Sequence, residues 1–92
     1  MNDNIYYVII PCYNPTDALI SLFYTISSHN NIKVIIVDDG SNSDNKFIYS
    51  KLPCNEYIFI ENSVNCGKGF SIKQGFSYLV KNSLEFKYVF TS

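Results

Sequence analysis

The sequence predicts an α/β fold with a Rossmann-like parallel sheet of about four strands and flanking helices. Four short apolar runs, rich in β-branched and aromatic residues, occupy residues 5–10, 34–37, 57–60 and 88–90. Each run is continuous rather than alternating, which is typical of strands covered on both faces of a parallel sheet. Segments with helical patterns separate the runs, so right-handed crossovers are expected to join neighbouring parallel strands.

The first crossover is predicted to be a helix with clear start signals. Asn14 or Thr16 can cap it, because both side chains accept hydrogen bonds from helix amides. Pro15 suits the first turn, and Asp17 favours the positive end of the helix dipole. The apolar residues that follow recur at helical spacing and form one stripe, made of Leu19, Leu22, Phe23 and Ile26.

The later crossovers differ in strength. Residues 43–51 form a weaker helical candidate, with only Phe47 and Ile48 as apolar anchors. A second clear helix is expected from about Lys68 to Lys81. Its buried face is predicted to consist of Ile72, Phe76, Leu79 and Val80.

The chain is expected to form one domain over residues 1–92, because no repeat or linker interrupts this order. Its last predicted strand ends at Phe90-Thr91-Ser92. In open α/β sheets the loops after the strands carry the ligand contacts, so we expect an N-terminal fragment of a longer domain. An unpaired edge at the fourth strand, or an apolar helix face, would then favour homo-oligomers.

Composition narrows the function classes. Eight acidic residues against seven lysines give a formal net charge of −1, so no nucleic acid is expected as a partner. No apolar run is long enough for a transmembrane segment, and the N-terminus lacks a secretory signal pattern. A cytoplasmic protein is therefore expected, with Cys12, Cys54 and Cys66 as reduced thiols. A lone His29 and no C-x-x-C pair argue against a structural zinc site.

Polar residues gather after the predicted strands. Asp38 and Asp39 end the second strand and precede Gly40. Successive strand residues point to opposite faces of the sheet. One carboxylate should therefore face the crevice, and the second carboxylate should face backbone amides. Such a carboxylate can accept hydrogen bonds from a nucleobase or ribose, or it can cap the turn in an ordinary structural role.

The segment Gly67-Lys68-Gly69 opens the second clear helix. Its glycines allow close backbone approach, and a helix N-terminus with a lysine favours anions; alternatively, the glycines merely shape a turn. The P-loop pattern is missing, and no glycine-rich fingerprint follows the first strand. An NAD enzyme and a P-loop NTPase are therefore poor interpretations.

The three segments together resemble family 2 glycosyltransferases. They are Val8-Ile9-Ile10-Pro11-Cys12-Tyr13-Asn14, Val37-Asp38-Asp39-Gly40-Ser41 and Asn65-Cys66-Gly67-Lys68-Gly69, with Gly75 further on. The last stretch is especially similar to polyprenyl-phosphate mannose and glucose transferases. The resemblance implies the N-terminal part of a GT-A fold and a role in polysaccharide or glycoconjugate biosynthesis. It implies the nucleotide-sugar-binding part of an inverting enzyme, which moves a sugar from a UDP- or GDP-linked donor to a glycan, polysaccharide or lipid-phosphate acceptor.

The resemblance also assigns site residues. Those implied to bind the nucleotide sugar are Pro11, Tyr13, Asn14, Asp38, Asp39, Gly67, Lys68 and Gly69. Asp39 matches the position that bonds the base, with Asp38 beside it. Pro11, Tyr13 and Asn14 are implied to line the nucleotide pocket. Gly67, Lys68 and Gly69 are implied to flank it near the base or the phosphates.

Two functional parts that the family expects are missing from these 92 residues. One is a D-x-D motif after the fourth strand, which would hold Mg²⁺ or Mn²⁺ against the diphosphate in the full-length enzyme. The other is the carboxylate base for the acceptor. We therefore assign no catalytic and no metal-binding residue and expect no turnover from this chain alone. A non-catalytic nucleotide-binding or interaction module, from a truncated or degenerate gene, remains an alternative; a sugar nucleotidyltransferase is disfavoured, because no glycine-rich loop follows the first strand.

Overall fold

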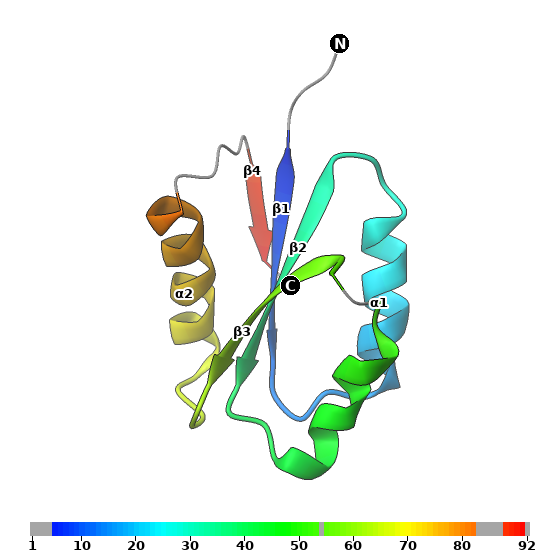
Figure 1. The fold of residues 1–92 in the computed structure, drawn as a ribbon. Helices are drawn as coiled ribbons and strands as arrows, with labels where there is room; N and C mark the ends of the chain where they lie inside the picture. Colours follow the sequence, from blue (N-terminus) through cyan, green and yellow to red (C-terminus); the bar gives the residue numbers. More distant parts are fainter. Residues whose placement is uncertain (1–4, 54, 83–87, 92) are drawn as a thin grey trace.

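The computed structural model describes residues 5–53, 55–82 and 88–91, with only the backbone described for the last segment. The elements in chain order are β1 (Tyr6–Cys12), α1 (Asp17–Ser27), β2 (Ile32–Asp39), the 3₁₀ helix η1 (Ser43–Lys51), β3 (Tyr57–Asn62), α2 (Lys68–Lys81) and β4 (Tyr88–Thr91). Figure 1 shows this alternation of strands and helices, which confirms the predicted α/β class.

All four strands are parallel, in the order β3-β2-β1-β4. The sheet therefore grows in one direction from β1 to β3 and continues on the other side of β1 with β4. Cys12 pairs with Asp38, and Asp39 pairs with Asn62, so the ends of β1, β2 and β3 are aligned. These carboxyl ends meet at one edge of the sheet, at the bottom of Figure 1. Parallel α/β sheets bind ligands at this edge.

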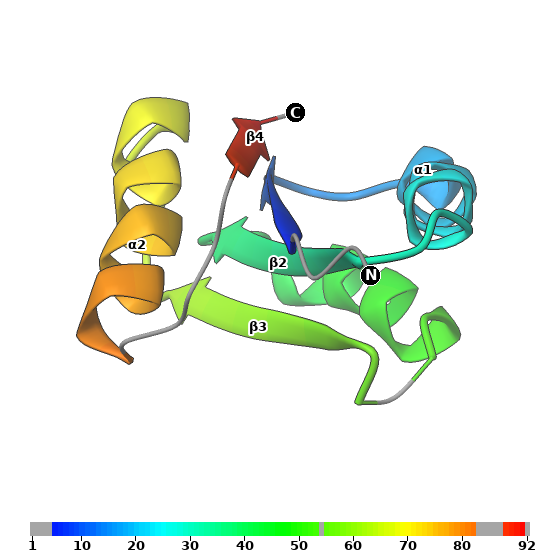
Figure 2. The same ribbon diagram turned by 90° about the horizontal axis from the view of Figure 1, so that it is seen from above.

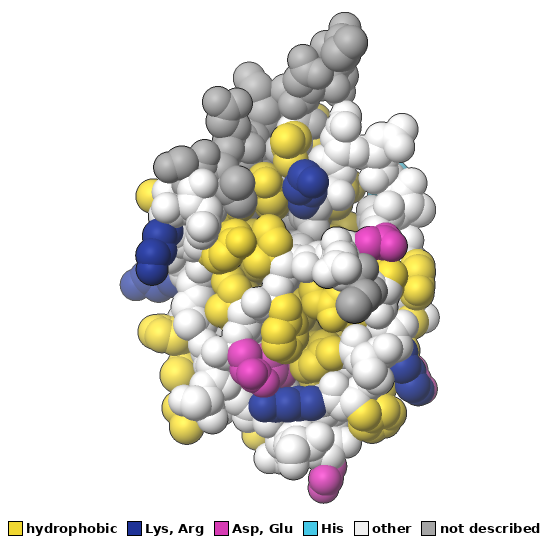
Figure 3. All heavy atoms as spheres, viewed as in Figure 1, with side chains coloured by type: hydrophobic (Ala, Val, Ile, Leu, Met, Phe, Trp, Pro, Cys, Tyr) yellow, Lys and Arg dark blue, Asp and Glu magenta, His cyan; other side chains and the backbone are white. Residues whose placement is uncertain are grey.

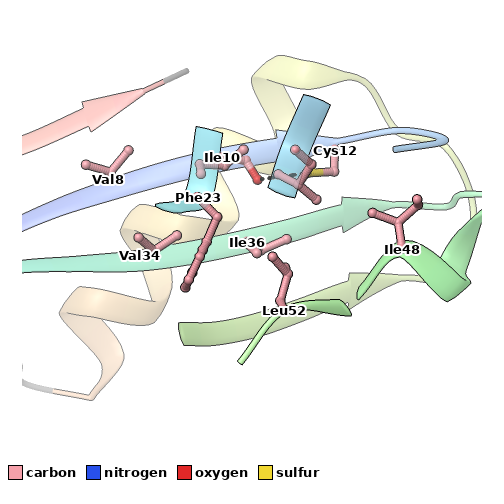
Figure 4. Packing of buried hydrophobic residues seen from close by; sticks show 9 residues of the cluster. Val8, Ile10, Cys12, Phe23, Val34, Ile36, Ile48 and Leu52 are labelled. Atoms are coloured by element: carbon pink, nitrogen blue, oxygen red, sulfur yellow. Dashed lines mark hydrogen bonds between the residues drawn. The ribbon is translucent and has the colours of Figure 1, made fainter. Parts of the chain in front are cut away.

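The helices cover both faces of the sheet (Figure 2): α2 lies on one face, and α1 and η1 lie on the other. Alternate residues of β1 and β2 therefore enter two different cores. The core under α2 contains Tyr7, Ile9, Ile35, Val37 and Leu79. The larger core under α1 and η1, shown in part in Figure 4, contains Val8, Ile10, Cys12, Leu19, Phe23, Val34, Ile36, Ile48 and Leu52.

The prediction of strands covered on both faces is wrong for β3. This strand is at the end of the sheet and pairs only with β2 among the described strands. Its apolar side chains are half-buried or exposed, and Phe59 is 41% exposed. Figure 3 shows hydrophobic side chains at the surface in the middle of this face of the molecule. A continuous apolar run thus does not separate a central strand from an edge strand.

The helix α1 begins as predicted, and the structure decides between the two candidate caps. The Thr16 hydroxyl accepts a hydrogen bond from the Ala18 amide at 3.4 Å, so Thr16 is the cap. In the weaker candidate, η1, only one of the two expected anchors is buried. Ile48 enters the core, whereas Phe47 is exposed.

The bounds predicted for α2 are confirmed, but part of its predicted buried face is wrong. Phe76 is exposed, and Val80 is 71% exposed. Leu79 is buried as predicted, and the helix also turns Ser71 and Gly75 toward the sheet. A Cβ on Gly75 would lie 2.7 Å from Ile9 Cδ1, so the helix approaches β1 through its glycine. This close approach sets the rotation of the helix, and the spacing of large apolar residues does not reveal it.

Within the described ranges, no helix combines the length and the apolar character that a bilayer-spanning segment requires. Among the described cysteines, Cys12 and Cys66 form no disulfide, and Cys54 lies outside the described residues.

Candidate functional site

A cavity of about 290 Å³ lies at the carboxyl ends of β1 and β2, beside the N-terminus of α2. Its walls come from the loop after β1, the end of β2 and the loop between β3 and α2. The lining residues are Pro11, Cys12, Tyr13, Asp39, Asn65, Gly67 and Lys68. Three segments that are distant in the sequence therefore form one site, as the alignment of the strand ends requires.

Asp39 is the acidic residue in the cavity wall. Asp39 is 4% exposed, and its carboxylate accepts hydrogen bonds at 3.0 Å from Asn62 Nδ2 and at 2.8 Å from the amides of Cys66 and Gly67. Oδ1 accepts from Asn62 and Cys66, and Oδ2 accepts from Gly67.

The same contacts determine the charge state of Asp39. Burial alone would raise its pKa, but hydrogen bonds from the Cys66 amide, the Asn62 side chain, the Gly67 amide and the Ser71 side chain outweigh burial. The pKa of Asp39 is therefore held below the ordinary aspartate value. The cavity contains an ionised acceptor at neutral pH.

Asp38 points to the other side of the sheet, so the two adjacent acids face opposite sides, as predicted. Its fully buried carboxylate accepts hydrogen bonds from the Ser41 amide at 3.1 Å, the Ser41 hydroxyl and the Tyr49 hydroxyl. Burial and the bond to Asp38 raise the pKa of Tyr49, so Tyr49 remains a donor. Asp38 holds the loop after β2 and is not part of the cavity wall.

Asn14 connects the first two loops. Its backbone has a positive φ of 49°, a left-handed conformation that asparagine tolerates better than most residues. The Asn14 amide donates to Ser41 Oγ at 2.8 Å, and Asn14 Oδ1 accepts from the Asn42 amide at 2.9 Å. These contacts fix the loop that carries Pro11 and Tyr13.

The second and third loops touch directly at Gly40. Its φ of 72° is left-handed, and a Cβ there would collide with the backbone of Val64 and Asn65. Beyond this contact, Gly67, with φ of 99°, is the N-cap residue that precedes α2. The first turn of α2 has no acidic residue, and Lys68 is exposed at the cavity. Lys68 therefore places a positive charge at this corner of the cavity, and the ionised Asp39 carboxylate binds the Gly67 amide beside it.

The model of the family described as glycosyl transferase family 2 matches residues 7–84. This span is most of the chain and contains all three loops. The chain belongs to glycosyl transferase family 2. The comparisons find no matching curated protein and no matching solved structure. The architecture is consistent with the N-terminal Rossmann-like part of the GT-A fold.

Five of the eight residues implied by the resemblance to family 2 glycosyltransferases line the cavity: Pro11, Tyr13, Asp39, Gly67 and Lys68. Asn14 and Asp38 lie behind the wall as connecting residues. Gly69 lies in the first turn of α2, where a Cβ would meet nothing within 4 Å. The binding roles of all eight stay predictions.

Sequence reasoning missed several residues of this family 2 site. Cys12 is buried in the core under α1 and also lines the cavity; burial raises the pKa of its thiol to about 11, so the thiol is protonated at neutral pH. Asn62 and Ser71 support Asp39, and Tyr49 supports Asp38. One signal was available, because Asn62 ends β3 as Asp39 ends β2, and aligned strand ends bring them together.

The described residues do not fit the divalent metal that the resemblance to family 2 glycosyltransferases implies. They contain no group of three or more His, Cys, Asp or Glu side chains that could hold an ion. The two carboxylates at the strand ends, Asp38 and Asp39, bind neutral donors from the chain itself. No chemical step through a metal is assigned to these residues.

Proposed function

We propose that this chain binds the nucleoside diphosphate of a sugar donor in the cavity, as the donor-binding part of an inverting glycosyltransferase. The acceptor would be a glycan, a polysaccharide or a lipid phosphate. The observation that supports this best is the position of Asp39, whose ionised carboxylate borders the cavity. Membership of glycosyl transferase family 2 supports the same class of ligand.

The nucleoside is proposed to lie against Asp39 and Tyr13. An ionised carboxylate accepts hydrogen bonds from a nucleobase N–H or a ribose hydroxyl, and such charge-assisted bonds are stronger than neutral ones. Tyr13 is 53% exposed and offers a ring on which a base can stack.

The diphosphate is proposed to lie on the Lys68 side. Lys68 supplies a cation there, and the N-terminus of α2 adds the positive end of a helix dipole. Asp39 would repel a phosphate placed against it, so charge orients the ligand with the nucleoside at Asp39 and the diphosphate toward Lys68.

Finer assignments within this proposal come from sequence alone. The segment Asn65-Cys66-Gly67-Lys68-Gly69 favours the polyprenyl-phosphate branch of the family. The protein is proposed to be cytoplasmic and to use Mg²⁺ or Mn²⁺ only as a full-length enzyme. Self-association through a sheet edge is tested by sedimentation, where a monomer at high concentration would contradict it.

The test is calorimetry of the 92-residue chain with UDP and with GDP, each with and without Mn²⁺. One nucleotide is expected to bind, and Lys68→Ala is expected to weaken it about tenfold through loss of one charge-assisted contact. Lys73→Ala removes an exposed lysine elsewhere on α2 and should change nothing. Failure of both nucleotides to bind, or equal affinities of the two variants, would overturn the proposal.

Asp39 needs a separate comparison because it also holds the fold together. Asp39→Ala is expected to abolish binding, whereas Asp44→Ala, at an exposed position in η1, is expected to leave it unchanged. Thermal melts establish whether each variant is folded. A folded Asp39→Ala variant with normal affinity would contradict the assigned role of this carboxylate.

A non-catalytic nucleotide-binding or interaction module is the second candidate. It is favoured by the hydrogen bonds that occupy Asp38 and Asp39 and by the lack of a metal-binding group in the described part of the chain. The chain alone is expected to have no transferase turnover. A metal-dependent rate of sugar transfer by the purified 92-residue chain would exclude this candidate and contradict that expectation.

A further inference from the structure

We propose that Ser41 is a positioning residue for nucleotide binding, which acts through Asn14 on Tyr13. This inference rests on the proposed function and adds a residue outside the cavity to it. The contacts run from the buried Asp38 carboxylate to Ser41, and from Ser41 Oγ to the Asn14 amide at 2.8 Å. Asn14 directly follows Tyr13, which lines the cavity.

In this relay, the series of hydrogen bonds from Asp38 through Ser41 to Asn14, each donor and acceptor is fixed. A serine hydroxyl has one proton to donate and lone pairs that accept. The Ser41 proton goes to Asp38 Oδ1, which also accepts from the Tyr49 hydroxyl. A lone pair of Ser41 Oγ is therefore available to the Asn14 amide, and the Asp38 carboxylate sets its orientation.

The backbone conformation of Asn14 explains why it needs this support. Its φ of 49° lies in a region that residues other than glycine rarely adopt. Two hydrogen bonds hold it there, one to Ser41 Oγ and one from the Asn42 amide. Without the Ser41 bond, Asn14 gains access to commoner conformations, and the chain direction at Tyr13 changes.

Tyr13 is the cavity residue most sensitive to this change. Half of its surface is exposed, so few packing contacts hold its ring in place. The position of the ring therefore depends on the position of the Tyr13 backbone. The other wall depends on different contacts, because the amides of Cys66 and Gly67 bind Asp39. Loss of Ser41 is therefore expected to move one wall of the cavity and leave the other in place.

The experiment compares Ser41→Ala with Ser41→Thr, which keeps the hydroxyl, and with Ser43→Ala at an exposed position nearby. Calorimetry with UDP and GDP is expected to show about tenfold weaker binding for Ser41→Ala. A loss of this size corresponds to the free energy of about one hydrogen bond. Ser41→Thr should retain most of the affinity, and Ser43→Ala all of it.

Amide hydrogen exchange gives a readout that does not depend on a ligand. In Ser41→Ala the Asn14 amide is expected to exchange at least about tenfold faster, while the amides of Cys66 and Gly67 keep their rates. An unchanged Asn14 rate overturns the inference whatever the affinities are. Failure of the unsubstituted chain to bind either nucleotide would refute the proposed function, and with it the role of Ser41 in binding, even if Asn14 loosens.

A double-mutant cycle tests whether Ser41 acts through Tyr13. In a Tyr13→Ala background, Ser41→Ala should cost no further affinity, whereas additive losses would overturn the inference.

Asn42→Pro removes the other hydrogen bond that holds Asn14, and it replaces Ser41→Ala as the test variant if Ser41→Ala does not fold. Asn42 has φ of −64°, which proline accepts, and proline removes the N–H that bonds Asn14 Oδ1. Faster exchange at Asn14 with weaker nucleotide binding supports the relay, and normal affinity with a loosened Asn14 refutes it.

Discussion

The bodies of β1 and β2 and the carboxyl ends of these strands are buried to a similar degree but by different means. In the bodies of β1 and β2 the buried side chains are almost all apolar and enter the two cores. The described residues that are both buried and polar all lie at or next to the carboxyl ends: Asp38, Asp39, Ser41, Asn62 and Ser71. Apolar burial has no direction, whereas a buried polar group needs a partner in a fixed geometry.

This difference separates stability from binding. A side chain in the strand bodies contributes volume and apolar area. Its loss is expected to reduce stability without changing the position of a loop. At the carboxyl ends, each polar side chain fixes the position of a neighbouring loop, Asp38 on one face and Asp39 on the other. Substitutions there are expected to change the cavity more than the core.

The largest expected loss of stability comes from the larger core. Phe23 is fully buried, with its ring centroid 5.7 Å from that of Tyr57. Phe23→Ala should lower the free energy of unfolding by about 3–5 kcal/mol, because it leaves a cavity. Urea denaturation measures this, with the exposed Ser21→Ala expected to stay within about 0.5 kcal/mol. A loss below 1 kcal/mol for Phe23→Ala would contradict the packing described.

A smaller loss is expected at the carboxyl ends from Gly40→Ala. A left-handed alanine costs about 1–2 kcal/mol, and the collision with the backbone of Val64 and Asn65 adds about 1–3 kcal/mol. Gly69→Ala, where a Cβ meets open space, is the control and should lower stability by less than about 0.5 kcal/mol. Equal urea midpoints for the two variants would show that the loops do not touch at Gly40.

A pH-dependent loss is expected from Asp39. Because its pKa is lower in the folded chain than in the unfolded chain, its contribution is complete above the unfolded value of about 3.9. The contribution is lost as the pH falls through the folded pKa. The unfolding free energy of Asp39→Asn should therefore depend less on pH than that of the unsubstituted chain below about pH 4. Parallel pH profiles would contradict the lowered pKa.

The smallest effect is expected for the ion pair between Lys46 and Glu61 on the surface. Its atoms are 2.7 Å apart, but both side chains are more than a third exposed and solvent screens the attraction. Lys46→Ala should leave the urea midpoint unchanged within error, at low and at high salt. A salt-dependent loss comparable to that of Gly40→Ala would show that surface charge stabilises this fold.

Sequence reasoning recovered the strands and the bounds of α2 because they depend on local pattern. It also brought the three loops together, because the ends of parallel strands are aligned. It failed for Phe76 and Val80 because the rotation of α2 depends on the contact between Gly75 and Ile9. Tyr49 was not foreseen as a partner of Asp38, since only the turn into η1 brings them together. Such contacts depend on three-dimensional packing between elements and leave no periodic signal.

The central claim is that a nucleoside diphosphate binds at the carboxyl ends of the strands. Amide chemical shifts, followed by NMR during titration with UDP or GDP, test it most directly. The largest changes are expected at Tyr13, Asn65, Gly67 and Lys68, which line the cavity. A second hollow of about 330 Å³ at the opposite end of the sheet, lined in part by Lys33, is the internal control and should not respond. Shifts confined to that second hollow, or no shifts at all, would contradict the claim.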